Sequence, residues 1–187
     1  MIKAAHYPGN PAATPALAWR RGWSAPTVLL CAALAGCGGG EIVRGPAPGS
    51  PHDWPTVAPR DPAAANAVLM RAISLVGTPY RYGGNTPAGG FDCSGLVNYV
   101  YSDMLDLRLP RSSRELAGFQ GPKIATPRLT TADLVFFGSA GSVTHVGIYV
   151  GEGRFVHAPS TGGTVRLDRL DGPYWRDHYS GAKRILD

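Results

Sequence analysis

The chain has 187 residues, of which 44% are hydrophobic and 17% charged, so it can bury the core of one ordinary domain and still carry extensions. No apolar run is long enough to cross a bilayer comfortably. The formal net charge is +5, but three of the 18 basic residues and none of the 13 acidic ones precede Cys37. The remainder has 15 basic and 13 acidic residues, a net charge of +2, so a nucleic-acid partner gains no support.

The first 37 residues have the organisation of a secretory signal. Basic residues precede a short apolar stretch over residues 25–35, which ends in the sequence Leu-Ala-Gly-Cys at 34–37. This ending resembles the lipobox of bacterial lipoproteins, in which the cysteine is acylated and becomes the mature N terminus. We therefore expect a signal peptide over residues 1–37, a lipid on Cys37 and membrane attachment through that lipid. An uncleaved N-terminal anchor is the alternative, although the apolar run is short for a span.

Cysteine usage then leaves a single free thiol. Cys31 would leave with the leader and Cys37 would carry the lipid, so only Cys93 remains. In an oxidising compartment paired cysteines are the norm, and an unpaired one is either structural and buried or reactive.

The folded domain is expected over residues 61–187. Residues 38–60 are rich in glycine and proline and predict an extended linker. A first helix is indicated by Asp61 as its cap, Pro62 in its first turn and Gly77 as its end. Its apolar side chains have helical spacing and are expected on one face: Ala65, Val68, Leu69, Ala72, Ile73 and Val76.

Two further helices are expected before the chain becomes strand-like. A glycine-rich loop over residues 78–85 leads to a helix from Cys93 to about Met104. Ser112 and Glu115 have the spacing of a capping box at the start of a short helix. The inward-facing positions of the helix that begins at Cys93 are predicted to be Leu96, Val97, Val100 and Met104.

The second half of the chain predicts antiparallel strands. Residues 134–137 form a continuous apolar run, and apolar residues alternate with others over 146–150. Glycines at 151 and 153 mark a turn, and residues 164–167 and 183–186 have the pattern of closing strands. Helices first and a meander of strands afterwards indicate an α+β fold.

The surroundings of Cys93 suit a nucleophile. Asp92 is a good helix cap, so Cys93 would lie in the first turn, where unpaired N–H groups and the helix dipole favour a thiolate. Gly95 lets other backbone or a substrate come close. Asp92 either only caps the helix or also helps to hold a substrate amine.

A thiol nucleophile needs a base, and that base needs a partner that orients its ring. His145 and His157 flank the turn, so the hairpin register decides whether they meet. A two-residue loop would place them on opposite faces. A three-residue loop, which the two glycines favour, pairs Val150 with Arg154 and places both histidines on one face, diagonal to each other. Gly147 would then leave the space between the rings unfilled.

The residues also allow two alternatives to a catalytic histidine pair. A single histidine in a strand is usually a satisfied polar residue. Cys93, His145 and His157 could also be three zinc ligands with an open position, but their spacing matches no compact ligand motif. No cofactor or metal is therefore expected.

Six ordered motifs resemble the NlpC/P60 family of cell-wall cysteine peptidases, most closely its lipoprotein murein endopeptidase branch. The resemblance covers about Ala65 to Leu186, and a Pro-Tyr-Trp segment at 173–175 also fits. Ala132 departs from the pattern, because the family usually has glycine there, and only a loop adjustment is expected. The motifs are Tyr80-Arg81-Tyr82-Gly83-Gly84, Asp92-Cys93-Ser94-Gly95, Leu109-Pro110-Arg111-Ser112, Asp133-Leu134-Val135-Phe136, His145-Val146-Gly147-Ile148-Tyr149 and Phe155-Val156-His157-Ala158.

The resemblance implies a papain-like fold and hydrolysis of peptide bonds in peptidoglycan. Cys93 would be the nucleophile, His145 the general base and acid, and His157 the orienting third member. Tyr82 resembles a tyrosine that contacts the substrate or the oxyanion, with the backbone N–H of Cys93 as another donor. Three further residues match positions that line the family's groove: Asp92, Ser94 and Arg111. A structural ion pair is an equal expectation for Arg111.

Three functions remain open from the sequence. They are a lipid-anchored peptidoglycan endopeptidase, an amidase of related fold that cuts between muramic acid and the first alanine, and a non-catalytic wall-binding lipoprotein. For an endopeptidase, the bond would be the D-Ala–diaminopimelate cross-link or the γ-D-Glu–diaminopimelate bond. Gly38, which follows Cys37, favours the outer membrane of a two-membrane bacterium, with the domain facing the periplasm, by analogy with lipoprotein sorting.

Overall fold

The computed structural model describes residues 53–160 and 163–186. The expected signal peptide and the lipid site at Cys37 lie outside these residues. The described part has the predicted α+β architecture. Its helices are α1 (Pro62–Ser74), α2 (Cys93–Leu105), α3 (Ser113–Gly118) and α4 (Pro173–His178), with a 3-10 turn at Thr126–Arg128.

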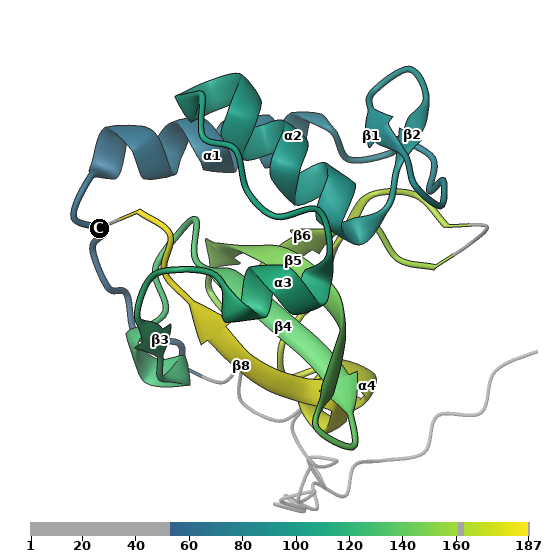
Figure 1. The fold of residues 1–187 in the computed structure, drawn as a ribbon. Helices are drawn as coiled ribbons and strands as arrows, with labels where there is room; N and C mark the ends of the chain where they lie inside the picture. Colours follow the sequence, from purple (N-terminus) through teal and green to yellow (C-terminus); the bar gives the residue numbers. More distant parts are fainter. Residues whose placement is uncertain (1–52, 161–162, 187) are drawn as a thin grey trace, which may run out of the picture. The chain divides into compact units, whose positions relative to one another are not determined.

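The strands form one large and one small antiparallel sheet. The small sheet pairs β1 (Asn85–Thr86) with β2 (Gly90–Phe91). The large sheet contains β3 (Lys123–Ile124), β4 (Leu134–Ser139), β5 (Ser142–Gly151), β6 (Arg154–His157), β7 (Arg166–Arg169) and β8 (Tyr179–Lys183). Its strand order is β3-β8-β4-β5-β6-β7, so the last strand inserts between the two that open the sheet. Figure 1 shows α1 and α2 above this sheet and α3 against its face.

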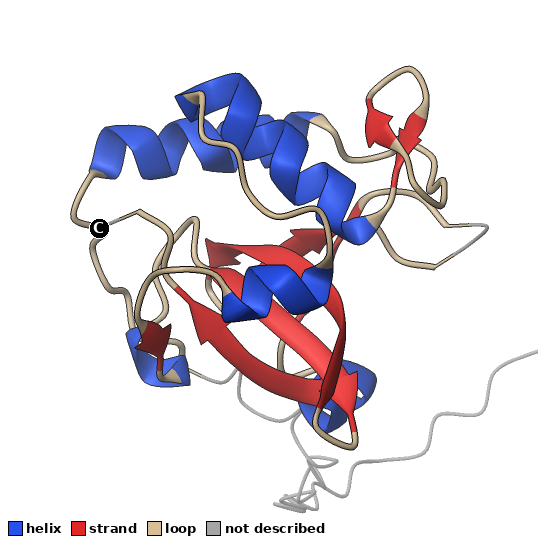
Figure 2. Ribbon diagram, viewed as in Figure 1, coloured by secondary structure: helices blue, strands red, loops and turns tan. Residues whose placement is uncertain are grey.

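The period of two along the strands gives the large sheet two different cores. One face packs against α1, α2 and α3 and carries Leu134, Phe136, Val146, Ile148 and Val156. The other face carries Val135, Phe137, Tyr149 and Phe155, which Trp54 and Trp175 help to cover. Figure 2 separates the two layers, with the helices of the first half on one side of the strands of the second.

Helix α1 begins as the sequence predicts, because an Asp61 carboxylate oxygen accepts a hydrogen bond from the backbone N–H of Ala64 at 3.0 Å. Its buried stripe differs from the expectation. Ile73 and Val76 are exposed, and Leu75 is buried in their place. The buried positions 65, 68, 72 and 75 keep helical spacing, because Leu75, the C-cap of α1, still has a helical conformation. Val76 follows the end of the helix and does not continue this face.

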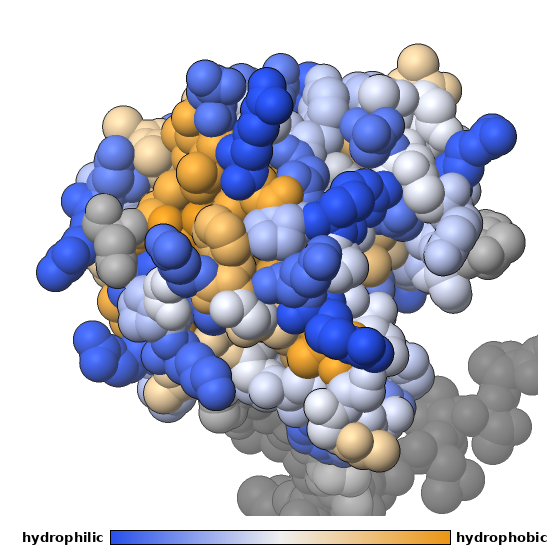
Figure 3. Space-filling model, viewed as in Figure 1, coloured by the Kyte–Doolittle hydropathy of each residue, from blue (hydrophilic) through white to orange (hydrophobic). Residues whose placement is uncertain are grey.

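Helix α2 buries Leu96, Val97 and Val100 as expected, but Met104 is 38% exposed and Tyr101 is buried instead. The Tyr101 hydroxyl donates to the backbone oxygen of Ala132, which turns this side of the helix towards the strands. Figure 3 shows apolar side chains gathered over the end of α2 and the loop that follows it. Leu105 and Leu107 lie there, partly buried against the first core.

The packed domain begins before Asp61. Trp54, which the sequence analysis places in the linker, packs against the second core, and its ring lies 6.5 Å from that of Tyr149. A Cβ on Gly153 would lie 2.1 Å from the indole nitrogen of Trp54, so the turn is shaped to receive this ring. The end of the stretch assigned to the linker is therefore part of the folded unit.

The capping box of Ser112 and Glu115 is present at the start of α3. The closing strands are displaced from the expected ranges: β7 lies at 166–169 and β8 at 179–183. Helix α4 ends at His178 and β8 begins at the next residue, so this strand starts four residues earlier in the sequence than expected. Among the residues that the structure describes, no helix is long and apolar enough to cross a membrane.

Candidate active site

Cys93 is the first residue of α2, as its sequence context predicts. An oxygen of the Asp92 carboxylate caps the helix by accepting a hydrogen bond from the backbone N–H of Gly95 at 2.7 Å. The other oxygen accepts from the backbone N–H of Gly83 at 2.9 Å. The glycine-rich loop and the helix start are thus tied together by one side chain.

Arg111 forms the structural ion pair that the sequence analysis considered. Its guanidinium donates to both oxygens of Asp92, at 2.7 and 2.8 Å, and to the hydroxyl of Ser94 at 2.7 Å. Burial alone would raise the pKa of Asp92, but the hydrogen bonds from Arg111 and Gly95 hold it below its usual value. Asp92 is therefore an ionised cap whose two oxygens are both engaged.

The turn between β5 and β6 differs from the expected three-residue loop. Gly151 pairs with Arg154, so the connection is a two-residue turn of Glu152 and Gly153. Both turn residues have positive φ, 52° and 70°, as a hairpin turn of this length requires. A bulge in β5 between Tyr149 and Gly151 supplies the residue that the longer loop would have added.

Because of this bulge, the register of the strand body is the predicted one. Ile148 pairs with Val156, which puts Gly147 opposite His157 and places His145 diagonally on the same face. A Cβ on Gly147 would come 3.3 Å from the Cβ of His157. It would also come 2.6 Å from Cδ2 of Phe155, so the space that the sequence predicts to be unfilled is taken up by the Phe155 ring, and only glycine fits beside it.

The two histidines meet and continue to a carboxylate. Nε2 of His145 lies 2.9 Å from Nδ1 of His157, and Nε2 of His157 lies 3.0 Å from Oδ2 of Asp168. A carboxylate only accepts hydrogen bonds, so Nε2 of His157 carries the proton it donates. Neutral His157 then accepts at Nδ1 from the Nε2 proton of His145, which leaves Nδ1 of His145 as a free base.

Aromatic rings enclose the histidine pair. The Trp175 ring of α4 stacks on His145, with centroids 5.3 Å apart and planes at 27°, and meets His157 edge-on at 4.8 Å. Phe137 and Phe155 lie next to the same rings. The indole N–H of Trp175 donates to Oδ2 of Asp168 at 2.8 Å.

This enclosure sets the charge state of the pair. Burial lowers the pKa of His145 to about 3, with the charge of His157 adding to the effect and Asp168 opposing it. Burial also lowers the pKa of His157 to about 4, again against the effect of Asp168. Both imidazoles are therefore neutral near pH 7, as a base must be before it takes up a proton.

The thiol lies beside the strand that carries the base. Cys93 receives a backbone hydrogen bond from Val146, the residue after His145, where β5 extends beyond its pairing with β6. Burial raises the pKa of Cys93, and the hydrogen bonds from Val146 and from the helix start only partly offset this. The expected preference for a thiolate at the helix start is therefore outweighed by desolvation.

The two tyrosines of the glycine-rich loop differ in their relation to the thiol. Tyr82, the residue singled out from the sequence, is 88% exposed. Burial raises the pKa of Tyr80, and the negative charges of Cys93 and Asp92 raise it further, so its hydroxyl lies within electrostatic range of the sulfur. Tyr80 joins the candidate site, and Tyr82 remains available to a substrate at its surface.

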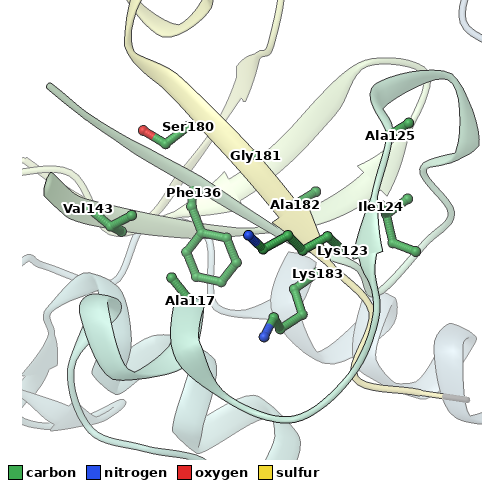
Figure 4. Close-up of a pocket in the computed structure, with 10 residues that line it drawn as sticks. All are labelled: Ala117, Lys123, Ile124, Ala125, Phe136, Val143, Ser180, Gly181, Ala182 and Lys183. Atoms are coloured by element: carbon green, nitrogen blue, oxygen red, sulfur yellow. The ribbon is translucent and has the colours of Figure 1, made fainter. Parts of the chain in front are cut away.

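A pocket of about 370 Å³ opens beside the base. His145 and Trp175 line it together with Phe137, Thr144, Arg166 and Tyr174. A separate cavity of about 460 Å³ lies between α3, β3 and β8, where Lys123 and Lys183 lie on the same side of Phe136 (Figure 4). Neither histidine of the pair lines this cavity, whereas His145 lines the first pocket, which is therefore the candidate substrate pocket although Cys93 is not among its lining residues.

Within residues 53–160 and 163–186, no group of three or more His, Cys, Asp or Glu side chains is arranged to hold a metal such as zinc. The ring nitrogens of His157 are both used in hydrogen bonds, to His145 and to Asp168. His157 therefore has no nitrogen to offer a metal without breaking the chain of hydrogen bonds.

Asp168 and Trp175 contribute to the site but were not among its predicted residues. Strand β7 pairs His157 with Arg166, and Asp168 lies two residues further on the same face. The alternation of Arg166 and Asp168 in the sequence was the available signal, but it required the register of β7. Trp175 was noted only as part of a motif.

The chain is similar in sequence to known proteins. Residues 77–184 match the model of the NlpC/P60 family. The chain is 40% identical over 126 residues to "Murein DD-endopeptidase MepH" of Escherichia coli, which covers 66% of this chain and 46% of the relative. It is 39% identical over 128 residues to "Gamma-DL-glutamyl hydrolase" of Bacillus subtilis, which covers 67% and 30% respectively. The chain thus spans less than half the length of these curated relatives.

Solved structures give the same result. An NlpC/P60 family protein from Bacillus cereus aligns with a TM-score of 0.62 and 30% identity, over 74% of this chain and 43% of its own. The family model covers more than half of the present sequence, and the fold agrees with it. The chain therefore belongs to the NlpC/P60 family, with a papain-like α+β fold.

Proposed function

We propose that this protein is a peptidoglycan endopeptidase, a cysteine peptidase that hydrolyses peptide bonds in stem or cross-link peptides of the cell wall. The observation that carries the proposal is the hydrogen bond between His145 and His157. His145 lies on β5, and the next residue of this strand, Val146, forms a backbone hydrogen bond to the thiol of Cys93. Relatives named as murein endopeptidases support the choice of substrate.

In the first step, the thiol of Cys93 attacks the carbonyl carbon of the scissile bond. Nδ1 of His145 takes up the thiol proton while the sulfur–carbon bond forms and the carbonyl electrons move onto oxygen. Because the free thiol and imidazole are both neutral, this proton transfer accompanies the attack and does not precede it. The backbone N–H of Cys93 and the hydroxyl of Tyr80 or Tyr82 would stabilise the oxyanion.

In the second step, the carbon–nitrogen bond breaks and His145 returns the proton to the leaving amine. Water then attacks the thioester, with His145 again taking up and returning a proton, and the acid product leaves. Since the leaving amine must reach His145, the pocket beside this residue would hold the amine side of the substrate. On the side of Cys93, we expect Asp92, Ser94 and Arg111 to line the substrate-binding surface.

The test is digestion of purified murein by the protein and by its Cys93→Ala variant. The wild type is expected to release muropeptides and the variant to release none, while thermal unfolding of the two proteins stays similar. Full release by the variant would refute the proposal. Mass spectrometry of the products assigns the bond, because an amidase would leave intact stem peptides and an endopeptidase would cut within them.

We further propose that Cys37 is acylated and anchors the protein to the outer membrane, facing the periplasm. The support is the lipobox-like sequence and the glycine that follows it. Labelling of the full chain with radioactive palmitate in a two-membrane bacterium tests this. The label should be lost in Cys37→Ser and kept in Cys93→Ser, with wild-type protein in the outer-membrane fraction. Equal labelling of the two variants would contradict it.

A further inference from the structure

We propose that Asp168 is a positioning residue for the base: through His157 it fixes the proton positions of both imidazoles so that Nδ1 of His145 is free to accept the thiol proton. The inference rests on the proposed function for its kinetic consequence. Its structural content, the position of the protons, is independent of which bond is cut.

Three groups converge on one oxygen of Asp168. Oδ2 accepts hydrogen bonds from Nε2 of His157 at 3.0 Å, from the indole N–H of Trp175 at 2.8 Å and from the guanidinium of Arg166 at 2.9 Å. The three donors come from β6, α4 and β7, so the carboxylate is held from different directions. Its side chain is only 21% exposed.

These donors keep Asp168 ionised. Burial alone would raise its pKa, but the hydrogen bonds from Arg166 and Trp175 hold it below the usual value, with the charge of His157 acting in the same direction. The charged and titratable groups that face it are therefore Arg166 on its own strand and His157, followed by His145. An ionised carboxylate has no proton to donate, so it can only hold His157 with the proton on Nε2.

The consequence reaches the base through one shared hydrogen bond. With its proton on Nε2, neutral His157 can only accept at Nδ1, and its partner there is Nε2 of His145 at 2.9 Å. His145 must then keep its own proton on Nε2, which leaves Nδ1 free. The reverse set of tautomers would put a proton on Nδ1 of His145 and remove the base.

Asp168→Asn tests this directly, because the amide has nearly the same shape but can donate to Nε2 of His157 and favour the reverse tautomers. With a purified cross-linked muropeptide as substrate, we expect kcat to fall by about 10- to 100-fold or more, with KM changed by less than about threefold. Asp171→Asn is the matched control. Asp171 also pairs with an arginine two residues before it, Arg169, and should keep wild-type kcat.

The proton positions can be read without any activity. Nitrogen-15 NMR of histidine-labelled protein should show Nε2–H and unprotonated Nδ1 for both His145 and His157 in the wild type. Asp168→Asn should move protons to Nδ1, and Asp171→Asn should not. Trp175→Phe keeps an aromatic ring but removes the N–H that donates to Asp168, so its kcat should fall less than that of Asp168→Asn. This variant replaces Asp168→Asn in the test if the latter does not fold.

Wild-type kcat in Asp168→Asn would overturn the inference, and so would Nδ1–H on His145 in the wild-type spectrum. If the variant does not fold, wild-type kcat and unchanged tautomers in Trp175→Phe would overturn it. Failure of the wild type to digest murein would instead refute the proposed function and leave the NMR result to decide the role of Asp168.

Discussion

At the scale of single residues, the reactive sulfur is governed by two opposing influences. Three backbone hydrogen bonds, from Val146, Ser94 and Cys93 itself, stabilise a thiolate. Burial and the nearby charge of Asp92 act against it and prevail, so the pKa of the thiol is raised. The free protein therefore holds a protonated thiol beside a neutral imidazole.

This charge state predicts the pH dependence of alkylation. The rate at which iodoacetamide modifies Cys93 should keep rising with pH through and beyond 9, because only the thiolate reacts rapidly. In Asp92→Asn the curve should move to lower pH, since an opposing negative charge is removed. Mass spectrometry of the modified peptide measures both rates. A plateau already reached at pH 7 in the wild type would contradict the raised pKa.

Ala132 is a second residue whose environment has an energetic consequence. Its φ is +70°, a conformation that costs a non-glycine residue about 1–2 kcal/mol. Its N–H bonds to the backbone oxygen of Tyr149 at 2.9 Å, which holds it there. The expected loop adjustment is thus absorbed as local backbone strain.

Ala132→Gly should therefore cost little, since the relief of strain offsets the lost methyl group and the greater freedom of the unfolded chain. We expect a change in the free energy of unfolding of less than about 1 kcal/mol. Ala72→Gly, which removes an equally buried methyl group from ordinary helix in α1, should cost about 2 kcal/mol. Urea denaturation of both variants measures the difference, and equal costs would show that Ala132 is not strained.

Individual site residues were predictable to different degrees. Cys93, His145 and His157 could be found because each is rare, and because strand parity alone tests whether two histidines share a face. Asp168 could not, since its role depends on how β7 pairs with β6 across a connection of unpredicted shape. Tyr80 and Tyr82 both follow from the sequence as candidates, and they differ in that Tyr80 is partly buried while Tyr82 is exposed.

At the scale of elements, the start of α2 depends on close contact with the glycine-rich loop. A Cβ on Gly95 would lie 2.0 Å from the backbone oxygen of Gly84 and 3.0 Å from a guanidinium nitrogen of Arg111. The sequence predicted that something would approach this glycine closely. The structure identifies it as the loop backbone, whose oxygen at Gly84 accepts hydrogen bonds from the N–H of Asp92 and the guanidinium of Arg111, both at 3.1 Å.

Gly95→Ala should destabilise the protein by about 1–3 kcal/mol even though alanine is the better helix former by about 1 kcal/mol. Activity on murein should also fall, because the helix start that carries Cys93 must shift. Gly118→Ala in α3 is the control, as its added Cβ meets nothing within 4 Å and should be neutral or stabilising. Thermal unfolding of both variants tests the contrast, and a stabilised Gly95→Ala would contradict it.

The β5–β6 hairpin shows how far patterns at this scale can predict structure. The face of each side chain followed from alternation, and the register of the strand body agreed with it. The turn did not, because one extra residue can be placed in the loop or in a bulge with the same effect on parity. Exposed positions near helix ends, such as Met104, were also misassigned, since periodicity does not say where the neighbouring layer stops.

At the scale of the whole molecule, the sheet separates a helical core from an aromatic core that encloses the histidines. This arrangement links stability to pH. His145 and His157 are neutral in the folded protein down to pH values of about 3 and 4, but in the unfolded chain they bind protons near 6.5. Between these values the unfolded state binds more protons, so stability increases with pH.

Stability should therefore be complete above about pH 7 and fall as the pH drops through 6.5 towards 4, by up to about 1.4 kcal/mol per pH unit for each histidine. Carboxylates with lowered pKa values, such as Asp92 and Asp168, add losses only at lower pH. Urea denaturation at pH 7 and pH 5 measures the slope. His157→Asn should reduce it, and an unchanged slope would contradict neutral burial of this ring.

The stacking of Trp175 on His145 has a consequence for the protein while it is being made. The sulfur, the two imidazoles and the indole that stacks on His145 come from widely separated stretches of the chain, at positions 93, 145, 157 and 175. A nascent or unfolded chain carries every reactive group yet has no assembled machinery. The arrangement of hydrogen bonds that leaves Nδ1 of His145 free as a base would thus arise only when the chain folds.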